Sequence, residues 1–285
     1  MKDATLTRKS NPDHHSVIAL TDTVSVGGDT LLIVGGPCAV ESEAQMAQVA
    51  RHLAQTPVQA LRGGVFKPRT SPYAFQGLGA EGLRILDDLR HRFQMPVISE
   101  VMAVDQISAM AAQVDVLQVG SRNMQNFDLL KALGRTTQPV LLKRGLAATL
   151  EEFVMAAEYI LSHGNPNVIL CERGIRSFDP YTRNVLDLGA VVALKQLTHL
   201  PVMVDPSHAA GKRELVPALA RAAIAAGADG LMVECHPVAD QSVSDARQAL
   251  SLEAMVDLVH SLGPIAAALG RHLAPNRAAP ALTTV

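Results

Sequence analysis

Apolar residues in this chain gather in short continuous runs that alternate with longer segments of helix-like pattern. The runs recur at intervals of about 20 to 40 residues and lack the apolar–polar alternation of a half-exposed strand. Continuous apolar runs are typical of parallel strands that are buried on both faces. We therefore expect eight strands, within residues 31–37, 58–66, 96–101, 116–120, 139–145, 168–174, 201–208 and 230–236.

Helix-like segments lie between and after these runs. They cover residues 43–55, 79–92, 104–112, 126–134, 149–162, 185–197, 212–226 and 246–262. Thr149 ahead of two glutamates, and Ser244 followed by Asp245, are typical helix start signals. Eight strand–helix units predict an α/β fold, a (β/α)8 TIM barrel. An open doubly wound sheet is the competing arrangement.

The barrel should occupy residues 31–264, with a segment on each side of it. Residues 1–30 are too short for a second domain. We expect them to form an N-terminal extension, as a small hairpin or a cap over the bottom of the barrel, with Gly27–Asp29 as a turn. Residues 265–285 are rich in Pro, Ala and Thr, so we expect a flexible C-terminal tail.

Composition limits the kinds of partner and the compartment. The chain has 25 Lys and Arg against 27 Asp and Glu, which gives no reason to expect nucleic acid or membrane partners. No apolar stretch approaches the roughly 18 residues of a membrane span, and the first residues lack the apolar core of a signal peptide. Three widely spaced cysteines argue against a disulfide framework. We therefore expect a cytoplasmic protein.

Chemically active side chains follow nearly every predicted strand. In TIM barrels the active site lies at the C-terminal ends of the strands, so these side chains should converge at one mouth. A charged residue directly after a buried strand is costly unless it has a partner or a ligand. The side chains are Cys38, Arg62, Lys67, Glu100, Arg122, Lys143, Arg144, Arg173, Asp205, His208, Glu234 and His236.

Seven of the basic residues near these strand ends form one predicted anion-binding set. They are Arg62, Lys67, Arg69, Arg122, Lys143, Arg144 and Arg173. A cluster of positive charges repels itself and is found mainly where bound anions neutralise it. We therefore expect a polyanionic substrate or two anionic substrates. Alternatively, some of them extend to solvent or pair with Glu100, Glu172 and Asp205.

A second set suits a metal ion: Cys38, His208, Glu234 and Asp245. Thiolate, imidazole and carboxylate ligands together favour a borderline divalent metal such as Mn, Fe, Co or Zn. The first, seventh and eighth strands are neighbours in a closed barrel, so the four can meet. The alternatives are a buried apolar role for Cys38 and a cap or core role for His208. Cys171 should pack in the core, and Cys235 should point away from Glu234.

Several long motifs give the chain a family resemblance from about residue 31 to residue 262. They are GPCAVES (36–42), RGGVFKPRTSPYAFQGLG (62–79), ISEV (98–101), QVGSRNMQN (118–126), LLKRG (141–145), ILCERG (169–174), VDPSHAAGKREL (204–215) and VECHP (233–237). With these motifs the chain resembles 3-deoxy-D-arabino-heptulosonate 7-phosphate (DAHP) synthases of the type I beta branch. That branch is related to the 3-deoxy-D-manno-octulosonate 8-phosphate (KDO8P) synthases.

The resemblance implies a role for each matching residue. The implied metal ligands are Cys38, His208, Glu234 and Asp245. The implied phosphoenolpyruvate ligands are Arg62, Lys67, Arg122, Lys143 and Arg173, and the implied erythrose 4-phosphate signature is Lys67, Pro68, Arg69 and Thr70. As a hypothesis for the mechanism, we expect Lys67, His208 and Asp205 to be catalytic, with Lys67 as proton donor and the other two managing protons or orienting water.

The resemblance also implies a reaction. Phosphoenolpyruvate, erythrose 4-phosphate and water would give DAHP and phosphate, the first step of the shikimate pathway. Pro68 and Arg69 after Lys67 match the heptulosonate enzyme, whereas the octulosonate enzyme has Ala-Asn-Arg-Ser there. Cys38 matches the metal-dependent members. A homo-oligomer, dimer or tetramer, is also implied. The alternatives are a KDO8P synthase that uses arabinose 5-phosphate, and a catalytically silent barrel that binds a phosphorylated metabolite.

Overall fold

The computed structural model describes residues 2–69 and 71–276. Its strands are β1 (Ile18–Ala19), β2 (Ser25–Val26), β3 (Thr30–Gly36), β4 (Ala60–Arg62), β5 (Val97–Val101), β6 (Val116–Val119), β7 (Val140–Lys143), β8 (Val168–Glu172), β9 (Val202–Val204), β10 (Gly230–Glu234) and β11 (His272–Leu273). Its α-helices are α1 (Glu43–Leu53), α2 (Ala80–Phe93), α3 (Ile107–Ala111), α4 (Phe127–Leu133), α5 (Leu150–Ser162), α6 (Leu188–Leu197), α7 (Pro206–Ala210), α8 (Val216–Ala225) and α9 (Leu252–Ala268). Short 3-10 turns lie at Val104–Gln106, Ser121–Asn123, Arg213–Leu215 and Ala239–Gln241.

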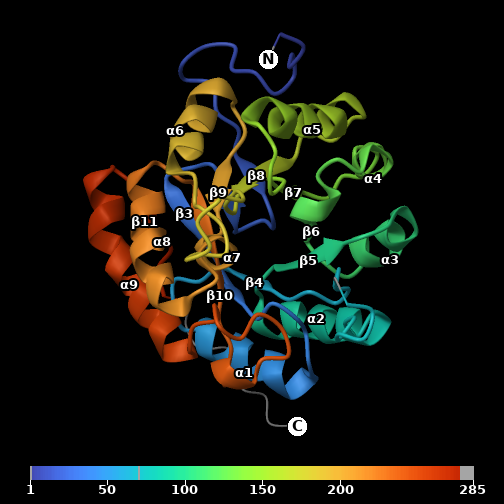
Figure 1. Cartoon of the computed structure of the whole chain (residues 1–285), viewed down its shortest axis with the longest axis vertical. Helices are drawn as coiled ribbons and strands as arrows, with labels where there is room; N and C mark the ends of the chain where they lie inside the picture. Colours follow the sequence, from blue (N-terminus) through green and yellow to red (C-terminus); the bar gives the residue numbers. More distant parts are fainter. Residues whose placement is uncertain (1, 70, 277–285) are drawn as a thin grey trace.

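Strands β3 to β10 form a closed parallel barrel. Each strand from β3 to β9 pairs in parallel with the next, and β10 also pairs with β3, with Gly230 opposite Leu32 and Glu234 opposite Gly36. Figure 1 shows the helices in a ring around the strands. The closure confirms the predicted TIM barrel, because an open doubly wound sheet leaves its two edge strands unpaired.

Some helix boundaries differ from the predicted ones. Thr149 caps α5 as expected, and its capping box with Glu152 is complete. The predicted start of the last helix at Ser244 and Asp245 is wrong, because α9 begins after Ser251, whose side chain accepts from Ala254 N–H. Residues 242–250 form a loop instead, and this loop positions Asp245 at the mouth of the barrel.

The N-terminal residues form a hairpin against the barrel interior. β1 and β2 are antiparallel, with Ile18 opposite Val26. The turn of this hairpin lies between Ala19 and Ser25, so the expected turn at Gly27–Asp29 instead connects the hairpin to β3. The hairpin's buried side chains join one apolar cluster with the barrel's inward-facing residues, among them Leu32 and Cys171.

A second and larger apolar cluster lies between the strands and the helices. It contains outward-facing strand residues such as Leu31 and Ile33 and the buried faces of the helices. Cys235 belongs to this outer cluster, on the opposite side of the strand from Glu234, as strand alternation predicts. Cys171 packs in the inner cluster, also as expected. Burial raises the pKa of each of these two thiols to about 12, which fits inert core packing.

The end of the chain adds one more strand pairing. β11 pairs in parallel with the start of β3, with His272 opposite Thr30. The predicted C-terminal tail, residues 265–285, therefore includes the last turn of α9 and this short strand. Its residues 277–285 lie outside the described part of the chain. Within the described part, no helix combines the length and the apolar character needed to cross a membrane.

Candidate active site

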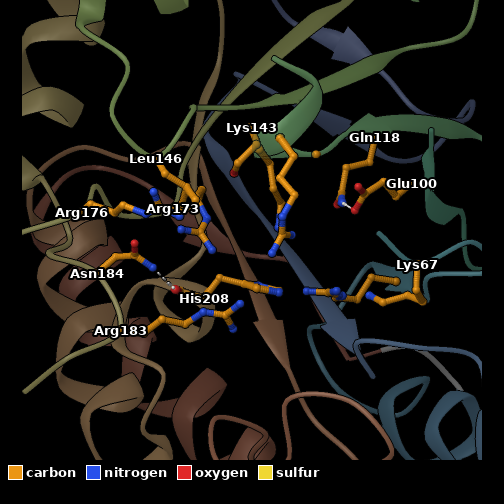
Figure 2. A pocket seen from close by; sticks show the side chains of 14 residues that line it. Lys67, Glu100, Gln118, Lys143, Leu146, Arg173, Arg176, Arg183, Asn184 and His208 are labelled. Carbon is orange, nitrogen blue, oxygen red and sulfur yellow. Dashed lines mark hydrogen bonds between the residues drawn. The ribbon is translucent and has the colours of Figure 1, made fainter. Parts of the chain in front are cut away.

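A cavity of about 270 Å³ opens at the C-terminal ends of the barrel strands. Figure 2 shows basic side chains that project into it from several sides. Its lining residues are Arg62, Lys67, Glu100, Gln118, Gly120, Ser121, Arg122, Lys143, Leu146, Arg173, Arg176, Arg183, Asn184 and His208. All five predicted phosphoenolpyruvate ligands are among them, so the structure brings these residues together.

Arg62 is one of the deeply buried cations of the cavity. It ends β4, and its Nη1 lies 3.3 Å from Glu234 Oε1 and 4.0 Å from Asp205 Oδ2. Neither its Nε nor its Nη1 has a hydrogen-bond partner among the described residues. Burial alone would lower the pKa of Arg62, but nearby acidic groups, Glu234 foremost, outweigh it and the pKa is raised. A buried guanidinium with unsatisfied donors is prepared to bind an anion.

The alternation of side chains along β7 and β8 decides which basic residues face the cavity. Lys143 points into it and is bound to the fully buried Asp205. Arg144, which we expected in the anion-binding set, lies on the other side, where it donates to Glu172 at 2.9 Å and to Asp187 at 3.0 Å. That expectation for Arg144 is therefore wrong, because consecutive strand residues face opposite sides. Arg173 faces the cavity, and burial lowers its pKa.

The loop after β4 carries the predicted sugar-phosphate signature. Lys67 is buried, and its Nζ donates to Cys38 O and to Cys38 Sγ, each at 2.9 Å. Arg69 donates from Nε to Phe75 O at 3.0 Å, within its own loop, and is not among the residues that line the cavity. Pro68 is half-buried beside it. Thr70 lies outside the described residues.

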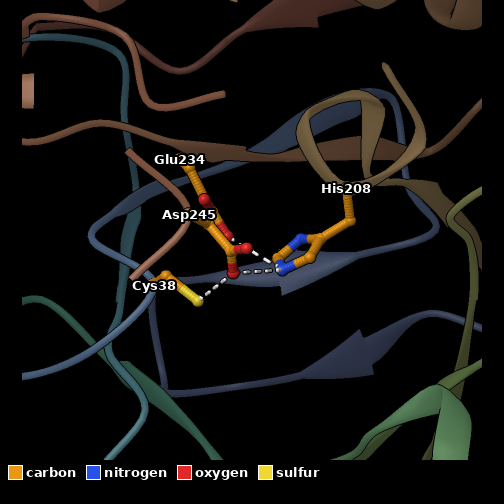
Figure 3. A group of neighbouring side chains, drawn as sticks. All are labelled: Cys38, His208, Glu234 and Asp245. Atoms are coloured by element: carbon orange, nitrogen blue, oxygen red, sulfur yellow. Dashed lines mark hydrogen bonds and ion pairs between the residues drawn. The ribbon is translucent and has the colours of Figure 1, made fainter. Parts of the chain in front are cut away.

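The four predicted metal ligands meet beside this cavity. One potential ligand atom from each of Cys38, His208, Glu234 and Asp245 lies within 4.8 Å of all the others. Figure 3 shows the four side chains converging from β10, α7 and two loops. Ligands on opposite sides of one transition-metal ion are about 4 to 4.6 Å apart, so a single ion can contact all four after small adjustments. Glu234 Oε1 is buried and makes no well-aligned hydrogen bond to the described residues, although His208 Nε2 lies 2.9 Å and Arg62 Nη1 lies 3.3 Å from it.

Local structure fixes His208 within this group. It lies in α7, whose N-cap Asp205 accepts from His208 N–H at 2.9 Å. The Nδ1 of His208 lies 2.7 Å from Asp205 Oδ2, and its Nε2 lies 2.9 Å from Glu234 Oε1. A carboxylate that accepts from the far ring nitrogen orients a metal-binding histidine. His208 and Asp205 therefore fit a carboxylate–histidine–metal arrangement.

The carboxylates and His208 shift each other's pKa values. Burial alone would lower the pKa of His208, but Asp205 and Glu234 outweigh it and raise the pKa to about 10. Burial would raise the pKa of Asp205, Glu234 and Asp245, but the charge of His208 and neighbouring basic groups lower all three. The acidic groups therefore remain ionised at neutral pH, which a cation site requires.

Several residues of the cavity wall were not predicted from the sequence, and three of them come from one loop. Arg176, Arg183 and Asn184 lie on the long loop between β8 and α6. They follow the strand by several residues, so a search limited to strand ends misses them. Two further arginines in a long loop at the C-terminal end of a predicted strand were the available signal.

The fold and this site together define the class of the protein: a TIM-barrel enzyme with a strongly basic mouth beside a candidate divalent-metal group. Residues 10–266 match the DAHP synthetase I family. That match covers most of the chain, and the chain belongs to this family.

Relatives and solved structures agree with the family assignment. The chain is 46% identical to phospho-2-dehydro-3-deoxyheptonate aldolase of Thermotoga maritima, over 93% of this chain and 78% of that one. It is 34% identical to 2-dehydro-3-deoxyphosphooctonate aldolase of Syntrophotalea carbinolica, over 83% of this chain and 91% of that one. The crystal structure of the Thermotoga maritima DAHP synthase superposes with a TM-score of 0.92 and 44% identity, covering 97% of this chain and 80% of that chain. A truncated form of the Thermotoga maritima enzyme gives a TM-score of 0.87 and 41% identity, covering 95% of this chain and 98% of that chain.

Proposed function

We propose that the chain is a DAHP synthase, which condenses phosphoenolpyruvate with erythrose 4-phosphate and water to give DAHP and phosphate. The new carbon–carbon bond joins C3 of phosphoenolpyruvate to the aldehyde carbon. Water adds at C2, and the phosphate leaves by C–O cleavage. The observation that carries this proposal is the 46% identity to the Thermotoga maritima heptonate enzyme over nearly the whole chain. The reaction places the chain at the first step of the shikimate pathway.

Two features favour the four-carbon aldose over arabinose 5-phosphate. Identity to the heptonate relative exceeds identity to the octonate relative, 46% against 34%. The residues after Lys67 are Pro68 and Arg69, as in heptulosonate enzymes. We assign Lys67, Pro68, Arg69 and Thr70 to erythrose 4-phosphate on this resemblance. The bond from Arg69 to Phe75 O would have to yield if its guanidinium binds the sugar phosphate.

The cavity supports the assignment of the phosphoenolpyruvate ligands. Five cations, at Arg62, Lys67, Arg122, Lys143 and Arg173, surround one space. Holding two anionic substrates side by side supplies proximity and orientation that their mutual repulsion would otherwise prevent. Lys67 lies nearest to the metal group and would face both substrates, so it can give a proton to the oxygen of the former aldehyde. Asp205 and His208 could also hold or move a proton.

Cys38, His208, Glu234 and Asp245 would hold the metal ion, which we propose to be Mn, Fe, Co or Zn. Their mixed thiolate, imidazole and carboxylate ligands suit a borderline divalent ion. When bound, such an ion supplies Lewis acidity toward the aldehyde oxygen. We also propose a homo-oligomer, dimer or tetramer, which light scattering of the purified chain would test.

A two-aldose assay tests the proposed function. Purified protein is supplied with phosphoenolpyruvate and either erythrose 4-phosphate or arabinose 5-phosphate, and phosphate release is measured with and without chelator. We expect release with erythrose 4-phosphate, lost in chelator and restored by divalent metal. A preference for arabinose 5-phosphate would make the chain a KDO8P synthase. No turnover with either aldose would favour a silent binding barrel.

A further inference from the structure

Two residues outside the candidate ligand set connect the two acidic ligands by hydrogen bonds. Arg183 Nη1 donates to Asp245 Oδ1 at 2.9 Å and to Gln248 Oε1 at 3.1 Å. Gln248, which is almost completely buried, donates from Nε2 to Glu234 Oε2 at 2.9 Å. We propose that Arg183 and Gln248 are positioning residues that hold Asp245 and Glu234 in the orientation that binds the metal. This proposal rests on the proposed metal role of those two carboxylates.

These bonds use one oxygen of each carboxylate and leave the other toward the metal group. Oε1 of Glu234, the oxygen that Gln248 does not bind, lies 2.9 Å from His208 Nε2. Oδ2 of Asp245, the oxygen that Arg183 does not bind, lies 3.1 Å from Cys38 Sγ and 3.9 Å from His208 Nε2. Each carboxylate is thereby fixed about its terminal torsion, which is otherwise broad. Glu234 Oε1 and Asp245 Oδ2, the two oxygens that would bind the ion, therefore both point toward the metal group.

The backbone fixes Arg183 relative to the third ligand. Arg183 N–H donates to Ala210 O at 3.0 Å, and the Asn184 side chain donates to His208 O at 3.1 Å. These bonds join the loop between β8 and α6 to the short helix that carries His208. Gly211 ends that helix with a φ of +67°, and a Cβ there would lie 2.5 Å from Arg183 Cβ. A glycine at this position therefore makes room for Arg183.

Asp245 needs such support more than the other ligands do. Like Cys38 it lies in a loop, whereas Glu234 ends β10 and His208 lies in α7. Unlike the other three ligands, Asp245 also has a positive φ, +59°, which non-glycine residues rarely adopt. Its bonds to Arg183 and Cys38 help to offset the cost of that backbone conformation. Of the four ligands, Asp245 should therefore be the one whose orientation is most disturbed when Arg183 is lost.

An electrostatic role and a positioning role for Arg183 predict opposite changes in metal affinity when Arg183 is replaced. The charge of Arg183 lies close to the metal group and repels an incoming divalent cation. If charge alone mattered, Arg183→Gln would bind the metal as tightly as the unsubstituted protein or more tightly. If Arg183 positions Asp245 and Gln248, the same substitution should weaken binding by about 10- to 100-fold, the usual effect of losing a residue that orients a ligand.

The test is a cobalt titration of the metal-free full chain, followed by the thiolate-to-cobalt charge-transfer band of Cys38. We expect Arg183→Gln and Gln248→Leu each to weaken Co²⁺ binding by about 10- to 100-fold. Arg183→Lys should retain part of the affinity, because an ammonium can still donate to one partner. Arg176→Gln is the matched control: it removes the same charge from the same loop, and the Arg176 guanidinium has no partner in the described part of the chain. It should bind Co²⁺ like the unsubstituted protein.

Each outcome decides a separate question. Unchanged or tighter Co²⁺ binding in Arg183→Gln overturns the positioning role. A raised KM for either substrate with unchanged Co²⁺ affinity also overturns it and makes Arg183 a substrate ligand. If the unsubstituted protein shows no charge-transfer band, the metal part of the proposed function fails instead. Circular dichroism checks folding, and if Arg183→Gln does not fold, the Arg183→Lys and Gln248→Leu titrations decide.

Discussion

Lys67 Nζ lies 2.9 Å from both the sulfur and the carbonyl oxygen of Cys38, so one buried ammonium joins the candidate metal group to the anion-binding cavity. Gly64 permits this contact, because a Cβ there would lie 2.8 Å from Cys38 O and 2.8 Å from Lys67 Cδ. The pair connects the end of the first barrel strand with the loop after the second.

Replacement of Lys67 should separate turnover from metal binding. Lys67→Met keeps an unbranched side chain of nearly the same length and removes the proton donor, so kcat should fall by about 100-fold or more. The variant should still give the Co²⁺–thiolate band, because the four ligands remain. Lys131→Met is the control, since Lys131 pairs with Asp128 on the exterior, away from the cavity. Near-normal kcat in Lys67→Met would remove Lys67 from the chemistry.

Cys38→Ser should lose both metal affinity and turnover. A hydroxyl is a far weaker ligand for borderline divalent ions than a thiolate. We expect the charge-transfer band to vanish and phosphate release to fall to the level of the chelator-treated enzyme. Cys235→Ala serves as the control, because Cys235 packs in the outer core. This variant should keep the charge-transfer band of Cys38. A band that survives Cys38→Ser would mean that another thiol binds the ion.

Strand alternation and strand order account for most of what could be predicted. Cys38 and His208 are far apart in sequence, yet the closure of β10 onto β3 brings their strand ends together. The same alternation separates Lys143 from Arg144, which we placed together because both follow one strand. Applying the side-chain period of two to that pair would have sent Arg144 outward, where Glu172 binds it.

The loops account for what could not be predicted. Arg183 lies eleven positions after the end of β8, and no periodicity encodes the path of such a loop. Ser244 with Asp245 resembles a helix start as closely as Ser251 does. The difference is tertiary, because Glu41 accepts hydrogen bonds from Ser242 and from Val243 N–H and so holds that segment out of a helix.

Gly36→Ala should damage both the fold and the anion site. Gly36 has a φ of +141°, and a Cβ there would lie 2.3 Å from Arg62 O. Relief of this clash would push β4 and Arg62 away from β3, so we expect a loss of about 2 to 4 kcal/mol in the free energy of unfolding. Urea denaturation measures the stability, and calorimetry measures phosphoenolpyruvate affinity. Gly28→Ala is the control, because a Cβ there meets nothing within 4 Å, and equal stability of the two variants would contradict the argument.

The N-terminal segment should detach from the barrel as the pH falls, and Glu158 should set part of that response. Both carboxylate oxygens of Glu158, on α5, accept hydrogen bonds from the backbone and hydroxyls of residues 5–7, at 2.7 to 3.0 Å. Burial raises the pKa of Glu158, but the bonds from Leu6 and Thr7 outweigh it, and the pKa lies below its usual 4.5. The stabilisation is therefore complete above about pH 4.5 and is lost as the pH falls through the lower, folded-state pKa.

His199 responds in a different pH window, so the two contributions can be separated. Burial lowers the pKa of His199, which is bound to Leu6 O and Ser16, and its contribution is lost only as the pH falls below 6.5. Glu158→Gln should open residues 2–9 at neutral pH, at a cost of about 2 kcal/mol in local stability. Hydrogen exchange of the N-terminal peptide from pH 7 to pH 4 measures both effects. The difference between the two proteins should shrink below pH 4.5, where the unsubstituted carboxylate becomes protonated as well. A constant difference across that range would show that the charge of Glu158 does not hold the segment.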